Sequence, residues 1–363
     1  REMKKQVMNF LSMALMALVL FSCEGNGKKG GKSLFTPVSS GRPYEMLVVI
    51  DKGMWERPAG RALFDVLDSD VPGLPQPERS FRISQIIPSK FDRGFRIFRN
   101  IIDVDIQPIY TQPKLKYSRD SYASPQMIMT IQAPDEQSFE EFVAKNRQVI
   151  VDFFTKAEMN RQINLLKEKY SPVVAAKVGS IFGCDVRIPA ELERYKEGKD
   201  FLWASSDNNS TNTSLNFVIY SYPYTDKNTF TKDYFVHKRD SVMKINIPGA
   251  REGQYIQTDA DYVDVKDFAV KGEYAFEARG LWYMENDMMG GPFVSHARVD
   301  RPNGRVVVVE GFVFAPEKKK RDLMRKLEAA LYTLNLPKEQ KLEEIVIKAS
   351  DLEEVIPDTT AVK

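Results

Sequence analysis

Two kinds of hydrophobic spacing alternate along the chain from residue 44 onward. Apolar residues recur three and four positions apart over 59–67, and they form short runs or alternate with polar residues over 44–50 and 81–87. The first spacing is typical of a helix face and the second of a strand. The same criteria predict strands at 127–131, 201–204, 215–220, 262–270, 273–283, 293–299 and 306–314, and helices at 135–154, 172–182, 229–237 and 316–334.

One segment fits both patterns. Phe91, Phe95, Phe98 and Ile102 have helical spacing, whereas residues 101–109 also read as a strand. We expect a helix followed by a strand there. Asp135 opens the next helix, because its carboxylate can accept bonds from the free amides of the first turn.

A strand, a proline and a charged helix follow one another three times. The prolines are at 134, 223 and 316, so the separations are 89 and 93 residues. Both a duplicated strand–helix unit and coincidence explain this order, because the unit is generic. Strands in succession mixed with helices predict an α+β fold with mostly antiparallel sheets and amphipathic helices packed on them. Asn303-Gly304 predicts a hairpin between the last two strands.

The N-terminal residues have the pattern of a secretory signal. Lys4 and Lys5 precede a run of 12 residues, 10–21, in which only Ser12 is not apolar. About 20 apolar residues are needed to cross a bilayer, so we expect cleavage and no permanent span.

The run ends in Leu20-Phe21-Ser22-Cys23, which resembles the lipobox of bacterial lipoproteins. The resemblance implies that Cys23 is acylated and becomes the first residue of the mature chain. Phe21 is bulkier than the usual occupant of its position. Acyl chains contribute about 0.8 kcal/mol per buried methylene, so two or more of them anchor a protein stably.

Charge and composition narrow the class of partner. Residues 1–22 hold three basic residues and one acidic residue, so the formal charge of +2 falls to zero for the remainder. A binder of nucleic acid would carry a strong excess of Lys and Arg, and we expect no such partner. Hydrophobic residues at 43% and charged residues at 28% are ordinary for a globular protein.

These observations predict five segments along the chain. We expect a lipoprotein signal peptide, a Gly/Lys tether, a first and a second α+β domain and a polar tail, at residues 1–22, 23–40, 41–195, 196–336 and 337–363. The tether has no apolar side chain from Glu24 to Ser33 and cannot form a core. Leu342, Ile345 and Val346 form a possible docking patch in the tail.

Strong catalytic signatures do not occur in the sequence, so we assign no catalytic residue, metal or cofactor. The densest polar and aromatic stretch runs from Trp282 through Glu285 and Asp287 to His296. Glu285 and Asp287 would share one side of an extended strand, where they could bind a ligand or act as an acid and base pair. A hairpin tip with solvated carboxylates, and a structural His296, explain the same residues.

The remaining reactive types have structural explanations too. Cys184 is the only thiol besides Cys23 and could be a nucleophile or a packed core residue. Trp55, Trp203 and Trp282 could stack on sugars or fill a core.

The order of lipobox, Gly/Lys tether and body opening with Gly41-Arg42-Pro43 resembles an uncharacterised family of Bacteroidetes lipoproteins. In such proteins an acidic cluster after the Cys goes with surface export, whereas here lysines follow. The resemblance therefore implies an anchor in the outer membrane that faces the periplasm. It also implies possible O-glycosylation at Ser241 and Thr359, each of which follows an Asp.

Taken together, the sequence predicts a lipid-anchored envelope protein that acts as a non-catalytic binding or assembly module for another envelope protein. Two alternatives remain open: an envelope hydrolase that uses Glu285 and Asp287, and a surface glycan-binding lipoprotein.

Overall fold

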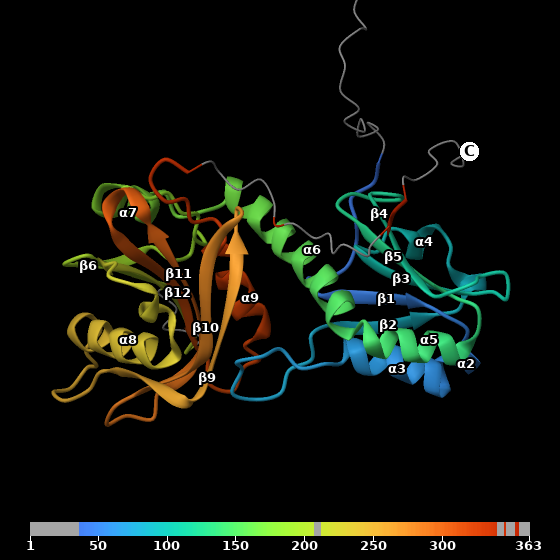
Figure 1. Ribbon diagram of the computed structural model, residues 1–363, viewed down its shortest axis with the longest axis horizontal. Helices are drawn as coiled ribbons and strands as arrows, with labels where there is room; N and C mark the ends of the chain where they lie inside the picture. The colour runs from blue at the N-terminus through green and yellow to red at the C-terminus, as the bar shows by residue number, and fades with distance from the viewer. Residues whose placement is uncertain (1–35, 207–211, 340–344, 346–352, 356–363) are drawn as a thin grey trace, which may run out of the picture. The chain divides into compact units, whose positions relative to one another are not determined.

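The computed structural model describes residues 36–206, 212–339, 345 and 353–355. Their strands form two sheets, one of six strands in the order β13-β4-β5-β3-β1-β2 and one of seven in the order β6-β7-β8-β12-β11-β10-β9 (Figure 1). The α+β fold class predicted from the sequence is confirmed. No helix among the described residues is both long enough and apolar enough to cross a membrane.

The six-stranded sheet is built mainly from parallel pairs. β1 pairs in parallel with β2 and β3, and β3 with β5, while β4 runs antiparallel to β5. The expectation of antiparallel sheets therefore describes only the seven-stranded sheet. The strands are β1 (Glu45–Val49), β2 (Arg82–Ile86), β3 (Asn100–Ile106), β4 (Lys114–Arg119), β5 (Met127–Ala133) and the short β13 (Glu353–Glu354).

The two faces of this sheet are covered differently. Met46, Val48 and Ile102 pack in one core with α3, α5 and the first half of α6. Leu47 and Val49 point to the other face, where Phe91 and Phe98 lie against them. The helices of this part are α2 (Lys52–Glu56), α3 (Pro58–Leu67), α4 (Arg93–Arg96), α5 (Glu136–Lys145) and α6 (Arg147–Glu168), with a 3-10 turn at Pro88–Lys90.

Two expectations for this region need correction. The helix predicted within residues 89–102 is only the four-residue α4, because the chain returns to the sheet at Asn100. The single helix predicted from Asp135 is two helices that break at Asn146. Asp135 is the N-cap of the first, as predicted, and accepts a hydrogen bond of 2.8 Å from the Ser138 amide.

Helix α6 belongs to more than one core. Its residues Phe153 and Phe154 lie in the core of the six-stranded sheet. Farther along the same helix, Ile163 packs with Ala329 of α9, and Leu166 lies in a core beneath the seven-stranded sheet. The two sheets are thus folded against a common helix.

The seven-stranded sheet is antiparallel throughout. Its strands are β6 (Arg194–Gly198), β7 (Phe201–Ser205), β8 (Ser214–Pro223), β9 (Ile256–Val270), β10 (Glu273–Met284), β11 (Gly290–Asp300) and β12 (Arg305–Phe314). β8 pairs with β12, so segments about 90 residues apart are neighbours. The tip between β11 and β12 is a 3-10 turn closed by Gly304 at φ 60°, which agrees with the predicted hairpin.

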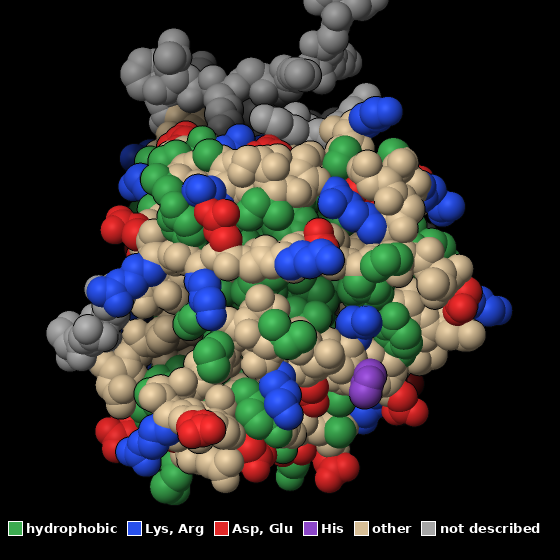
Figure 2. Space-filling model, turned by 90° about the vertical axis from the view of Figure 1, so that its left-hand side faces the viewer, with side chains coloured by type: hydrophobic (Ala, Val, Ile, Leu, Met, Phe, Trp, Pro, Cys, Tyr) green, Lys and Arg blue, Asp and Glu red, His purple; other side chains and the backbone are tan. Residues whose placement is uncertain are grey.

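Each face of this sheet has its own helices. α7 (Pro172–Phe182) and α9 (Arg321–Leu331) cover one face together with Val307 and Val309. α8 (Lys232–Asn246) covers the other with Val306 and Val308. On the outer face drawn in Figure 2, charged side chains interrupt the hydrophobic ones.

The segment boundaries predicted from the sequence can be placed on this architecture. The boundary after residue 195 falls inside β6, and α7 before it already packs with the seven-stranded sheet. Of the three strand–proline–helix units, one (β5–α5) lies in the six-stranded sheet and two (β8–α8, β12–α9) in the other.

In the tail, Ile345 exchanges hydrogen bonds of 2.6 and 2.9 Å with Asn160 of α6, whereas Leu342 and Val346 lie outside the described residues.

Close packing of β11 against β12 gives a test of this arrangement. A methyl group on Gly291 would lie 2.0 Å from the backbone oxygen of Val313, which cannot yield as a flexible side chain would. We therefore expect Gly291→Ala to lower the free energy of unfolding by about 1–3 kcal/mol, the usual cost of overpacking. Gly94→Ala is the matched control, because its nearest neighbour is a side-chain oxygen at 3.4 Å. Equal urea midpoints for the two variants would contradict the packing described.

Candidate functional site

The residues predicted as a polar and aromatic site lie on the hairpin of β10 and β11. Trp282 is 3% exposed, and its indole nitrogen donates a 3.3 Å hydrogen bond to the Val313 carbonyl. Its ring packs edge-on to Phe312 with centroids 5.5 Å apart. Trp282 therefore fills the core on the α8 side of the sheet.

Glu285 and Asp287 do not share one side of a strand, as the sequence suggested. The strand ends at Met284, and both residues lie in the turn that follows. One oxygen of Asp287 accepts bonds from the amides of Met288 (2.7 Å) and Met289 (3.2 Å), and the other accepts a 2.9 Å bond from the Gln254 side chain. The Asp287 carboxylate thus holds the turn in shape.

His296 is separated from that turn. It lies five positions beyond Gly291 on β11, or about 17 Å at strand spacing. Its register partner on β10 is Glu277, and the imidazole Nε2 is 3.4 Å from a Glu277 oxygen. The rings of Phe268 and Tyr332 lie against the imidazole at 4.7 and 4.9 Å. The structure therefore pairs His296 with Glu277 and not with Glu285.

Glu277 is the centre of a buried charge cluster beneath α9. It is 1% exposed and accepts a 2.7 Å bond from Arg279, which in turn donates 2.8 Å to Glu328 of α9. Burial acts to raise the pKa of Glu277, but the nearby imidazole of His296 and the charge of Arg279 outweigh it, so this pKa is well below its usual range. The cluster thus joins the sheet to α9 by ionised groups. Sequence reasoning missed Glu277 because a single acid in an alternating strand gives no signal.

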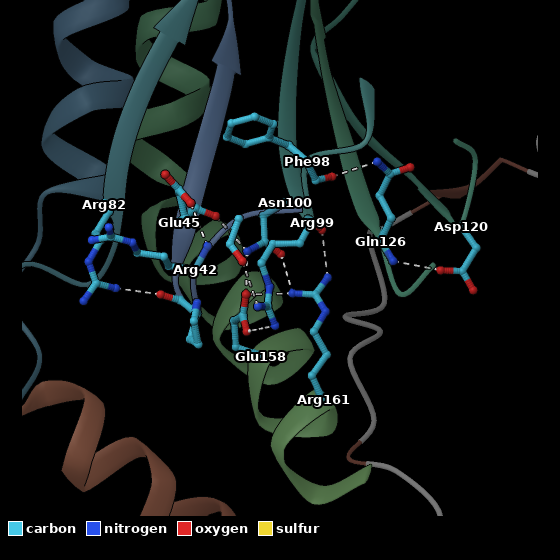
Figure 3. A network of polar contacts seen from close by, with 12 residues as sticks. Arg42, Glu45, Arg82, Phe98, Arg99, Asn100, Asp120, Gln126, Glu158 and Arg161 are labelled. Carbon is cyan, nitrogen blue, oxygen red and sulfur yellow. Dashed lines mark hydrogen bonds and ion pairs between the residues drawn. The ribbon is translucent and has the colours of Figure 1, made fainter. Parts of the chain in front are cut away.

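A second buried carboxylate lies beside the first residue of β3, in the interior of the six-stranded sheet. Glu158 of α6 is fully buried and accepts hydrogen bonds from Arg99 (2.9 Å), Asn100 (2.7 Å) and Arg161 (2.7 Å), as Figure 3 shows. Asn100 also donates 2.9 Å to the Glu45 carbonyl of β1. Burial lowers the pKa of Arg161. A sequence signal existed here, because Glu158 follows Phe154 and Ala157 on the apolar stripe of α6.

A cavity of about 710 Å³ opens at the end of the seven-stranded sheet, near the β11–β12 turn. Its walls combine three aromatic rings with charged groups of both signs. The aromatic residues are Tyr224, Phe230 and Tyr274, and the charged residues are Lys227, Asp267, Glu273, Arg298, Asp300, Arg301, Lys338 and Glu339. The volume is within the usual range for ligand sites, but the lining holds more charged groups than most such sites do. The sequence did not bring these residues together.

The polar groups of this cavity are buried in its wall but exposed at its rim. In the wall, Arg298 is 3% exposed and donates bonds of 2.5 and 3.2 Å to the two oxygens of Glu339. Burial acts to raise the pKa of Glu339, but the Leu336 amide and Arg298 outweigh it and lower that pKa. At the rim, Tyr274 is 42% exposed and donates a 2.6 Å bond to Asp267. A ligand would meet the exposed rings and charges first.

The other candidates have separate places in the structure. Trp203 donates a 3.0 Å bond to Asn216, and the ring of Trp55 packs on Phe64 with centroids 5.9 Å apart. Ser241 lies exposed on α8. Cys23 and Thr359 lie outside the described residues. Within the described part of the chain, no three His, Cys, Asp or Glu residues are grouped as ligands for a metal ion.

Comparison with known families gives two matches that follow one another. Residues 39–167 match a domain of unknown function (DUF8532), and residues 171–333 match another domain of unknown function (DUF4837). No curated protein matches the chain. The first match covers the strands β1–β5 and nearly all of α6, and the second covers α7 through α9. The chain is thus similar to uncharacterised domain families, and the matches assign no activity.

The Glu277 cluster predicts a pH-dependent stability. Because the folded pKa of Glu277 is lowered, its contribution is fully present above the unfolded value of about 4.3 and is lost as the pH falls toward the folded pKa. We expect Glu277→Gln to cost about 3 kcal/mol at pH 7, and this difference to shrink by about 1.4 kcal/mol per pH unit below 4.3. Urea unfolding at pH 7 and pH 3 measures it. The exposed Glu273→Gln is the control, and a cost independent of pH would show that Glu277 does not act through its charge.

Cys184 offers a second test. It is 4% exposed, and burial raises the pKa of its thiol to about 12. At pH 8 only about one thiol in ten thousand is then ionised, so alkylation by iodoacetamide in the folded protein should be slower by a factor of about a thousand or more than after denaturation. Mass spectrometry of the peptide that contains Cys184 measures the rate. Rapid alkylation in the folded state would restore the nucleophile hypothesis.

Proposed function

We propose that this chain is a lipoprotein of the cell envelope whose body binds another envelope protein without catalysing a reaction. The sequence Leu20-Phe21-Ser22-Cys23 after a 12-residue apolar run supports acylation at Cys23. On this proposal the anchor lies in the outer membrane and the body faces the periplasm, as in the Bacteroidetes lipoproteins that the chain resembles. The matches to domains of unknown function are compatible with that resemblance.

The cavity near the β11–β12 turn is the observation that carries the binding role. Tyr224 and Tyr274 are 37% and 42% exposed there, and aromatic residues are enriched at the energetic centres of protein interfaces. Lys227 and Arg301 on its wall are exposed cations, while Asp267 and Glu273 are exposed anions. A protein segment with apolar and charged side chains of both signs complements such a lining, whereas a uniformly charged polymer does not.

The two alternative functions receive less support from the residues on which they depend. A hydrolase based on Glu285 and Asp287 needs two free carboxylates, but one oxygen of Asp287 accepts bonds from amides of its own turn and the other accepts a bond from the Gln254 side chain. Capture of glycans through Trp282 needs an open ring face, and Trp282 is 3% exposed. The hydrolase would still be supported if Glu285→Gln with Asp287→Asn abolished a turnover on cell-wall substrates while the fold persisted.

Site-specific photo-crosslinking in growing cells tests the binding role. A photoreactive residue at Lys338, on the exposed rim of the cavity, should form a discrete crosslink to one identified envelope protein. The same residue at the exposed Lys52 on α2 is the matched control and should give none.

The crosslink should also depend on the cavity lining. We expect Tyr274→Ala to weaken binding of the purified partner by about 1–2 kcal/mol, or roughly five- to thirtyfold, because it removes an exposed ring from the lining. Circular dichroism and thermal unfolding check that the variant is folded. No crosslink at Lys338, or one that Tyr274→Ala leaves unchanged, would contradict a binding role for this cavity.

A further inference from the structure

The surface around α4 combines exposed cations with aromatic rings. Lys90, Arg93 and Arg96 are exposed, and Phe95 between them is 37% exposed. Tyr122 from the loop between β4 and β5 is 36% exposed, and its ring centroid lies 5.2 Å from the guanidinium carbon of Arg96. We refer to these five residues as the α4 surface.

The α4 surface carries more positive than negative charge. The nearest acid in the sequence, Asp92, caps α4 and accepts a 3.0 Å bond from the Gly94 amide. Asp120 in the neighbouring loop accepts a 2.8 Å bond from the Gln126 amide. Both carboxylates are therefore turned to backbone amides. Within the part of the chain that the structure describes, no ion pair joins either carboxylate to Lys90, Arg93 or Arg96.

The α4 surface rests on a fixed backbone. Gln126 is 1% exposed, and its side-chain amide donates a 2.7 Å bond to the Phe98 carbonyl (Figure 3). The same amide donates a 2.6 Å bond to the Arg96 carbonyl. Phe98 packs against the apolar face of the six-stranded sheet, and the rings of Phe95 and Phe98 are stacked at 6.1 Å. Binding would therefore cost little ordering of this segment.

The described chain begins beside this surface. The Ser40 amide donates a 2.8 Å bond to the Ile97 carbonyl, and the Arg99 amide donates 3.0 Å back to Ser40. On the other side, the Ser39 amide donates 3.2 Å to the Ser124 carbonyl. Residues 39 and 40 are thus held between the end of α4 and the loop that carries Tyr122. An anchor upstream in the chain is therefore joined to the folded body beside the α4 surface.

Chain length limits how far this point can lie from the anchor. Ser40 is 17 positions after Cys23, so covalent geometry alone keeps it within about 60 Å of that residue. The α4 surface is therefore held within reach of any bilayer that contains an acyl chain on Cys23.

We propose that the α4 surface docks on the anionic phospholipid headgroups of the bilayer that anchors the chain. This inference rests on the proposed function, because it needs the acylated Cys23. Lys and Arg near an anionic bilayer strengthen attachment by roughly fivefold each, and aromatic rings such as Phe95 and Tyr122 favour the interface. The contact gives the anchored body one preferred face toward the membrane.

Depth-dependent fluorescence quenching tests this orientation. The full chain, purified from cells with its acyl groups, is placed in vesicles of phosphatidylglycerol and phosphatidylethanolamine that carry a headgroup-labelled quencher lipid. A fluorophore is attached at Ser89→Cys beside the α4 surface or, as the matched control, at Ser241→Cys on α8; both positions are exposed, and Cys184 is buried. We expect strong quenching at position 89 and little at position 241.

Charge variants then separate docking from chance proximity. Arg93→Glu with Arg96→Glu should lower the docked-to-undocked ratio at least about tenfold, and so should about 0.5 M salt on the unaltered chain. Lys52→Glu with Lys319→Glu makes the same change of charge at other exposed positions and should leave the quenching unchanged. The salt result does not depend on how the variant folds.

The outcomes distinguish the two proposals. If the chain does not float with the vesicles, the anchor and hence both proposals are wrong. If it floats but positions 89 and 241 are quenched equally, or the double Arg variant and salt change nothing, the anchor stands and docking of the α4 surface is refuted.

Discussion

The structure depends on one buried carboxylate, that of Glu158 on α6. An ionised group without exposure is costly unless it is paired, and removing a partner from such a site typically costs about 3–5 kcal/mol. Here Arg99, Asn100 and Arg161 satisfy it, so the start of β3 must meet α6 at this point. The same helix continues to Ile163 and Leu166, which belong to other cores. The position of β3 and the contacts of α9 are therefore set by a single helix.

This constraint also explains how the two surfaces proposed to bind partners are formed. The α4 surface is held by Gln126 and by the turn into β3, which the Glu158 network fixes. The cavity is formed at the far end of β11, where Arg298 and Glu339 pair in its wall. Both surfaces thus expose aromatic and charged side chains over buried polar contacts, which are the Gln126 amide bonds under the α4 surface and the Arg298–Glu339 ion pair in the cavity wall. Buried pairs contribute more to a defined geometry than to net stability.

Much of the fold could be predicted from the sequence because local rules decide it. Alternation placed β10 to β12 nearly as observed and found the second part of β9, and the helix cap at Asp135 followed from its side-chain chemistry. The parallel pairing of β1 with β2 and β3 could not be predicted, because it depends on contacts distant in sequence. The same dependence on distant contacts explains why the partner of His296 could not be predicted. Proximity in sequence grouped Glu285 with His296, whereas strand register pairs His296 with Glu277.

The central claim is that a lipid on Cys23 ties this body to a bilayer, and the mass of the mature N-terminal peptide measures it most directly. The protein is isolated from its own cells, digested, and its first peptide is weighed. The account predicts a peptide that begins at Cys23 and carries two or more acyl chains, since one chain anchors only weakly. A peptide with an unmodified Cys23, or a mature chain that begins at another residue, would contradict it.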